Sequence, residues 1–282
     1  MDTRFLNLKF ESGNDVLNIE KDSDYKLIKI EGIESSDYEI TIENYTQYDG
    51  GYTNKKRVLP RDISIVCDYC NSENTEMERQ KLIRFFNPKQ QGILTVNYCG
   101  VERYIIYELE NFKDLRENLY ERLSFSLNLI CPDPYFKDII LGEQISTWIG
   151  GWKFKFKLPF RFKQKGEPKK NIYNEGHVET PVEIIFKGPA VNPSIINNRT
   201  GEFIKVDRTL TSDDTLYITT EFRNKKVEIE RDGVRTNAFN YIDLDSTFFQ
   251  LKTGDNMIEY TTENNLDPQS VEIKYRNRYL GV

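Results

Sequence analysis

The residues best suited to chemistry in this 282-residue chain are its four cysteines and its one histidine. Cys67 and Cys70 are spaced as C-x-x-C, which could supply half of a zinc site or a redox pair. The other cysteines, Cys99 and Cys131, lie too far apart in the sequence for the compact spacing of a zinc site. Cys67 ends the alternating run 63–67, so the pair does not open the helix that a thioredoxin-like motif needs. We expect reduced thiols and no metal.

The remaining residues do not indicate a catalytic centre. His177 lies in the polar stretch 174–177, which is typical of a surface loop. The sequence has no G-x-S-x-G or H-E-x-x-H motif and no glycine-rich nucleotide loop. A glycosidase needs only two carboxylates about 5–10 Å apart, and Asp243 and Asp245 are one candidate pair. A solvated strand end explains this pair more simply, so we predict no enzyme and no cofactor. A glycoside or peptidoglycan hydrolase is the enzymatic alternative.

One basic stretch could form a binding surface. Residues 152–170 contain eight Lys and Arg residues interleaved with aromatic ones, against a single acid, Glu167. Exposed aromatic rings among cations are typical of single-strand nucleic-acid binders. Strict alternation instead favours a strand with one buried face, and lysines on an edge strand discourage unwanted pairing. We prefer the strand, and we keep as a candidate secondary binding face Trp152, Lys153, Lys155 and Lys157.

The composition predicts that strands position these residues. Aromatic residues make up 13% of the chain, whereas alanine occurs only as Ala190 and Ala238. Alanine is the strongest helix former, and aromatic and β-branched residues favour strands. A chain of 282 residues corresponds to about two domains. No apolar run reaches the about 20 residues of a membrane helix, so we expect no membrane partner.

The N-terminal part predicts strands and one inserted helix. Residues 122–129 form the clearest strand, because their Leu and Phe side chains all point one way. Residues 38–42 alternate similarly, which predicts a half-solvated strand. Thr75 and Glu78 have the spacing of a capping box, and Asn87-Pro88 would stop the helix, so a helix is expected over 75–86. Further strands are expected at 62–67, 92–96 and 102–110.

A stiff segment with two prolines, 131–135, follows the last of these strands. We predict an N-terminal domain over 1–135, a linker over 136–150 and a C-terminal domain over 151–282. Short strands separated by Gly and Asn turns predict a jelly-roll or galectin-like sandwich in the second domain; they are 182–186, 202–206, 215–219, 226–230, 257–261 and 271–275. The predicted fold class is mainly β, with two β-sandwich domains.

The excess of acidic residues lies in the N-terminal part of the chain. Residues 1–135 carry 17 Lys and Arg against 24 Asp and Glu, a balance of −7, and the whole chain has a net charge of −6. A protein that binds duplex DNA would need the opposite sign to neutralise phosphates.

Three stretches together resemble the distal tail proteins of siphovirus-type phages. Residues 127–138 are similar to the end of that family's N-terminal domain, where a strand runs into a linker motif; here the motif is Cys131, Pro132, Asp133, Pro134 and Tyr135. A turn pattern resembles the start of the C-terminal domain; it comprises Asn174, Gly176, Pro181, Gly188, Asn192, Pro193, Asn197 and Gly201. The run 248–258 resembles the family's L-x-x-G-x-N-x-I motif, with Thr253 in place of the family's proline.

This resemblance implies a structural protein of the virion tail tip, made in the bacterial host cytoplasm. It implies a hexameric ring formed by the N-terminal domains, with DNA present only in transit. The implied partners are other copies of the chain, the tail tube protein, the tail-tip hub or tail-associated lysin protein, and a receptor-binding protein. The charge balance adds the hypothesis that acidic residues line the ring. A carbohydrate-binding module involved in host-surface recognition is the alternative function.

Overall fold

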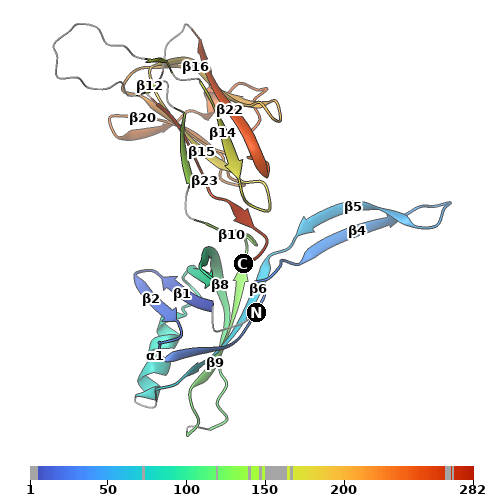
Figure 1. The fold of residues 1–282 in the computed structure, drawn as a ribbon, viewed down its shortest axis with the longest axis vertical. Helices are drawn as coiled ribbons and strands as arrows, with labels where there is room; N and C mark the ends of the chain where they lie inside the picture. Colours follow the sequence, from blue (N-terminus) through green and yellow to red (C-terminus); the bar gives the residue numbers. More distant parts are fainter. Residues whose placement is uncertain are drawn as a thin grey trace. The chain divides into compact units, whose positions relative to one another are not determined.

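The computed structural model describes residues 6–71, 74–118, 120–138, 141–145, 148–149, 164–165, 168–263, 268 and 270–282. The chain forms two compact units. The N-terminal unit contains 1–138 together with the last four residues, and the C-terminal unit contains 139–278. Strands dominate the described residues, with one α-helix, α1 (Figure 1). The predicted mainly β fold class is confirmed.

The N-terminal unit is built on one sheet that folds over on itself, in the order β2-β1-β7-β8-β9-β6-β3. The long strand β8 pairs with β7 through its first half and with β9 through its second half. The register shifts between Leu109 and Asn111, and such a bulge bends the strand. The strands are β1 (Leu6–Ser12), β2 (Asp15–Ile19), β3 (Tyr25–Glu31), β6 (Arg61–Tyr69), β7 (Gly92–Tyr98), β8 (Val101–Asp114), β9 (Ser124–Cys131), and the short β10 (Phe136–Lys137) and β24 (Arg278–Tyr279).

Side chains from both halves of this sheet meet in one core. Leu8 and Leu94 from one half join Ile65 and Leu127 from the other in a single buried cluster. Strand β9 shows why the strand forms, because every second residue is buried, as the alternation predicted. A chain of aromatic rings also crosses the core; its centroid distances are 5.4 Å for Phe10–Phe86, 6.1 Å for Phe86–Phe112 and 5.6 Å for Phe112–Phe125.

The helix α1 (Thr75–Phe85) lies within one residue of its predicted bounds, but the predicted capping box is wrong. The residue before the helix, Asn74, has a left-handed backbone and makes no capping hydrogen bond through its side chain. Glu78 instead accepts a hydrogen bond from the hydroxyl of Tyr25 and pairs with Lys81. Leu82 and Phe85 are buried, which fixes the helix to the core.

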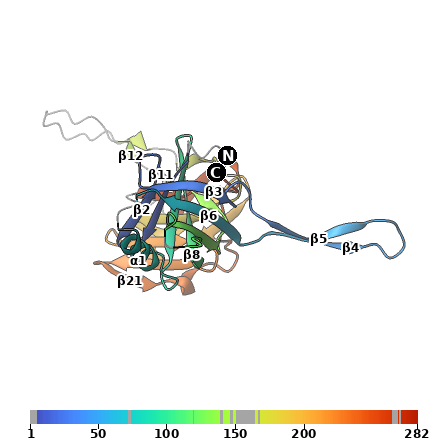
Figure 2. The ribbon, with the colours of Figure 1, turned by 90° about the horizontal axis from the view of Figure 1, so that it is seen from below.

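The strand predicted at 38–42 is present, but the expectation that one of its faces is buried is wrong. Strand β4 (Tyr38–Asn44) pairs only with β5 (Gly51–Val58), in a two-stranded sheet of its own. Nearly every residue of both strands is exposed. The hairpin extends away from the sheet of the N-terminal unit in both views (Figures 1 and 2). We call residues 38–58 the arm.

The C-terminal unit contains two facing sheets, in the orders β11-β23-β15-β19-β20-β21 and β14-β22-β16-β17. Ile184, Ile218 and Ile273 of the first sheet share one buried cluster with Ile195 and Ile258 of the second. This confirms a β-sandwich. The strands are β11 (Leu141–Ile145), β14 (Lys169–Asn174), β15 (Val182–Lys187), β16 (Ala190–Asn197), β17 (Glu202–Lys205), β18 (Thr209–Leu210), β19 (Thr215–Thr219), β20 (Lys226–Arg231), β21 (Val234–Asn237), β22 (Gly254–Glu263) and β23 (Ser270–Tyr275), with the short pair β12 (Trp148–Ile149) and β13 (Gln164–Lys165).

The boundaries of the compact units differ from those expected. The segment 136–150 is divided between them, because β10 belongs to the N-terminal unit and β11 pairs with β23 in the C-terminal unit. The last four residues belong to the N-terminal unit, so the chain crosses between the units twice.

Candidate interaction surfaces

Two of the four cysteines lie in positions that favour inert thiols. Cys67 and Cys131 are buried, whereas Cys70 and Cys99 are exposed, and none forms a disulfide. Burial raises the pKa of the Cys67 thiol to about 12, and burial likewise raises the pKa of Cys131 to about 12. In the described part of the chain, no group of three or more His, Cys, Asp or Glu side chains could hold a metal ion.

The other candidates for chemistry lie on the surface. His177 is exposed, and its main-chain N–H donates to the Arg278 carbonyl, 2.8 Å away. Asp243 and Asp245 lie in a turn, where the Asp243 carboxylate accepts the main-chain N–H of Asp245 at 2.9 Å. This bond is the local pattern of an Asx turn. The predicted binding face of Trp152, Lys153, Lys155 and Lys157 lies outside the described residues.

The arm carries an apolar row that the chain leaves exposed. Alternation along β4 places Tyr38, Ile40 and Ile42 on one face of the ribbon. Ile40 is 52% exposed and Ile42 is 63% exposed. A two-stranded hairpin is marginally stable at best in water. A partner that covers this row would therefore stabilise the arm.

The opposite face of the arm is held together by polar contacts. Glu39 pairs with Arg57, and Glu43 accepts hydrogen bonds from the hydroxyl of Tyr52, at 2.6 Å, and from the side chain of Asn54. Glu43 also raises the pKa of Tyr52 through this bond. These contacts order the ribbon while its apolar row stays uncovered.

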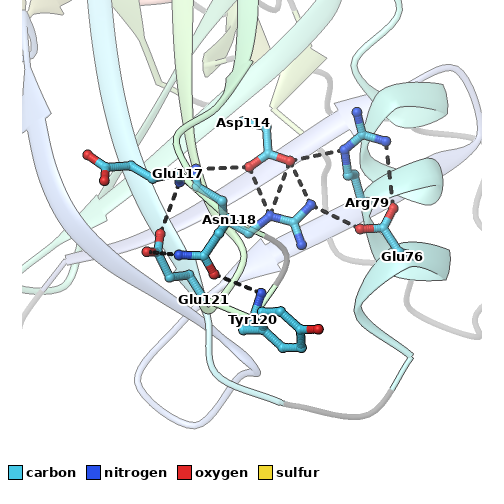
Figure 3. A network of polar contacts seen from close by, with 8 residues as sticks. Glu76, Arg79, Asp114, Glu117, Asn118, Tyr120 and Glu121 are labelled. Carbon is cyan, nitrogen blue, oxygen red and sulfur yellow. Dashed lines mark hydrogen bonds and ion pairs between the residues drawn. The ribbon is translucent and has the colours of Figure 1, made fainter.

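A second exposed surface lies between β8 and β9, at residues 115–118 and 120–123, which we call the tip loop. Its Tyr120 side chain is fully exposed. Asn118 donates to Glu121 at 2.6 Å and accepts the main-chain N–H of Tyr120 at 3.0 Å (Figure 3). These bonds fix the main chain at Tyr120, and a fixed main chain lowers the entropic cost of binding a partner there.

Charged side chains fasten the tip loop to α1. The Arg116 guanidinium donates to Asp114, at 2.7 Å, and to Glu76, at 3.1 Å. Arg79 donates to the same Asp114 carboxylate at 3.0 Å (Figure 3). The hydrogen bonds that Arg116 donates lower the pKa of Asp114, and the same bonds raise the pKa of Arg116. Both groups therefore stay charged, and the network holds over the physiological pH range.

The linker motif joins a buried arginine. Cys131 ends β9 in register with Arg61, and Asp133 pairs with Lys137 at 2.8 Å. The Pro134 carbonyl accepts a hydrogen bond from Nε of Arg61 at 2.9 Å. Pro132 is exposed and Tyr135 is half-buried. The motif thus holds the end of β9 against the strand that follows the arm.

Sequence reasoning missed the arm and the tip loop as surfaces. The alternation in β4 gave no sign that the apolar face would be left open, since a buried face gives the same pattern. The density of tyrosine in 38–52 was the available signal, because it is typical of interface cores.

Comparisons with known proteins find a family match in the C-terminal unit. Residues 175–279 match the family model described as "Siphovirus-type tail component, C-terminal domain". The match covers most of the C-terminal unit, which is therefore similar to the C-terminal domain of siphovirus-type tail components. The predicted resemblance to distal tail proteins is confirmed, in line with the prediction of a structural protein.

Solved structures of phage proteins share the fold of this chain over nearly its full length. The crystal structure of SPP1 Dit (gp 19.1), described as a hub adsorption apparatus in phages that infect Gram-positive bacteria, matches with a TM-score of 0.68 and 13% identity, over 97% of this chain and 99% of that one. Chains in two structures of the activated phage P2 baseplate, with Ca and with Sr, match at TM-scores of 0.53 and 0.55 and 12% identity, over 96% of this chain and 98% of those. None of the curated proteins matches the chain. Among the described residues, no helix has the length and apolarity to cross a membrane.

Proposed function

We propose that this chain is a tail component that forms a hexameric ring at the tail tip, joins the tail tube to the hub or tail-associated lysin protein, and lets DNA pass. The observation that carries the proposal is the arm, an ordered ribbon with an uncovered apolar row. A ring requires one surface of each subunit to bind a different surface of the next. An arm that reaches out from its own sheet meets this requirement, because it can lie on a neighbouring copy.

The tip loop is suited to a contact along the tail. Strand β9 begins at the tip loop and ends at the linker, so its eight residues separate the two by about 26 Å. The loop therefore lies at the end of the N-terminal unit away from the linker, where the tube or the hub would bind. Exposed Tyr120 is the anchor expected for such a protein partner.

The acidic balance of the N-terminal unit fits passage of DNA without retention. A lumen lined by Lys and Arg would hold the duplex through release of its counterions. We infer that part of the excess of acidic residues in 1–135 faces the lumen. A ring whose lumen is dominated by cations would contradict this inference.

Labelling of whole phage particles tests the location. Antibodies against this chain, seen by electron microscopy, are expected to bind at the tail tip of particles assembled in the host cytoplasm. Label on the capsid, or along the tail shaft, would contradict the proposal. A receptor-binding protein attached to the C-terminal unit would extend the labelled complex outward.

A second candidate function is glycan binding by the C-terminal unit. Tyr173 is exposed on β14, and next to it Asn171 donates to Asp255 at 2.7 Å across the β14–β22 pair. An aromatic ring beside polar side chains that donate and accept hydrogen bonds suits a sugar. Binding of the full chain to bacterial wall glycans, lost in Tyr173→Ala, would support this function, and no binding at millimolar glycan would exclude it.

A further inference from the structure

Three distant parts of the chain meet at Arg61, three residues after the arm ends. The Arg61 side chain is among the largest fully buried ones, with 2% of its surface exposed. Its guanidinium donates to the Gly32 carbonyl and to Ser36 Oγ, each at 2.5 Å, and to the carbonyls of Pro134 and Leu280. A buried cation needs several such partners, since an unpaired one is strongly destabilising.

Two of these partners belong to the arm root, which we define as 32–37 and 59–61. The main-chain N–H of Leu59 donates to the Asp37 carbonyl at 2.9 Å and closes the base of the arm. Gly32 has a positive φ of 88°, and a side chain there would overlap the Asp62 carbonyl. Residues 32–37 of the arm root are therefore packed closely on Arg61 and on the start of β6.

The last four residues, Tyr279–Val282, lie against the same root. Val282 donates its main-chain N–H to the Ile33 carbonyl at 3.0 Å. A side chain at Gly281 would overlap the main-chain oxygen of Glu34. From the other side Arg103 donates to the Gly281 carbonyl at 2.5 Å, and its guanidinium lies 3.6 Å from the centre of the Tyr279 ring. We call these four residues the strap.

We propose that the strap locks the arm root, and that displacing the strap frees the arm to change direction. The strap contacts Arg61 and residues 33–34 directly. Arg61 in turn binds Gly32 and Ser36 of the arm root. The strap directly follows the point where the chain returns from the C-terminal unit. Of the two main-chain connections between the units, this one leads directly into the strap, so a pull on the C-terminal unit through it acts on the strap. This is a conformational device in the N-terminal unit, and it holds whether or not the arm forms a ring.

Hydrogen exchange of the full-length protein tests the strap. Gly281→Ala should displace it, because the new methyl group meets backbone and not a flexible side chain. The expected result is exchange about tenfold faster in peptides that cover 32–37 and 59–61, because a charged hydrogen bond and its neighbours are lost. Leu280→Ala is the matched control, since it keeps the carbonyl that Arg61 binds. It should leave exchange in the arm root within twofold of the wild-type rate.

A second variant decides the result if Gly281→Ala fails to fold. Arg103→Gln weakens the strap from β8 and changes nothing at the arm root. Exchange in the arm root is expected to rise several-fold in this variant. Unchanged exchange in 32–37 and 59–61, with faster exchange at Val282, would overturn the proposal. Ring formation plays no part in this measurement, so its outcome is independent of the proposed function.

Discussion

Replacing Ile40 and Ile42 of the arm by serine should weaken assembly without weakening the fold. Both side chains are more than half exposed in the single chain, so their loss leaves no cavity in a core. In a ring the arm would cover them against the next subunit. The double variant should therefore keep the thermal stability of the wild-type chain and lose affinity between copies.

The size of the effect follows from the exposed surface. Burying a whole isoleucine side chain contributes about 1.5–3 kcal/mol. With 52% of Ile40 and 63% of Ile42 available for burial, the two together contribute about 2–3 kcal/mol per contact. Since 1.4 kcal/mol is a factor of ten, the dissociation constant of each contact should rise roughly a hundredfold.

Sedimentation velocity over a range of protein concentrations measures this change. The matched control is Leu244→Ser, which removes a fully exposed leucine from a turn of the C-terminal unit and should leave assembly unchanged. Equal assembly of the double variant and the wild-type chain would refute the reasoning. So would an equal loss in Leu244→Ser, because the effect would then be one of general surface hydrophobicity.

Three further predictions concern stability and thiol chemistry. Arg61→Met should lower the free energy of unfolding, measured by chemical denaturation, by about 3–5 kcal/mol, because it leaves four oxygens without their donor. The control Arg57→Met, in the exposed arm, should change it by less than about 0.5 kcal/mol. Equal effects of the two variants would contradict the buried network. Hydrogen bonds from Arg231 hold the pKa of Asp214 well below its usual range, so the carboxylate stabilises the fold at neutral pH and this stabilisation is lost as the pH falls below about 4. Asp214→Asn should therefore lower the melting temperature at pH 7 and make the melting temperature depend less on pH in acid. A steeper dependence on pH would show that the sign is wrong. A thiol reagent at pH 8 should modify Cys70 and Cys99 of the folded chain quickly, and Cys67 and Cys131 only after unfolding. Rapid reaction of all four thiols would show that Cys67 and Cys131 are not protected by burial.

The strands of the C-terminal unit illustrate what the sequence can predict. Alternation found β19 and β20 to within a residue of their ends, because each has one face in the core. It missed β16, where Asn192 and Pro193 suggest a turn. The structure places these residues at a register shift between Val191 and Ser194, so the turn signal marks a bulge inside a strand.

The surfaces were harder to predict than the elements, for a physical reason. The pattern of β4 indicates that one face is apolar, but only the strand pairing and the exposed fractions show that the described part of the chain leaves that face uncovered. The strap depends on contacts between residues more than 200 positions apart, such as Arg61 and Leu280. No local pattern encodes such a contact.

The mass of the native assembly tests the central claim, that the chain acts by binding its neighbours. Native mass spectrometry should be run on the full chain alone and with the tail-tip hub protein of the same phage. The account predicts a closed hexamer of about 200 kDa, six times the 33.3 kDa chain, with the hub protein added to it in the mixture. A chain that stays monomeric at all concentrations, with and without the hub protein, would contradict it.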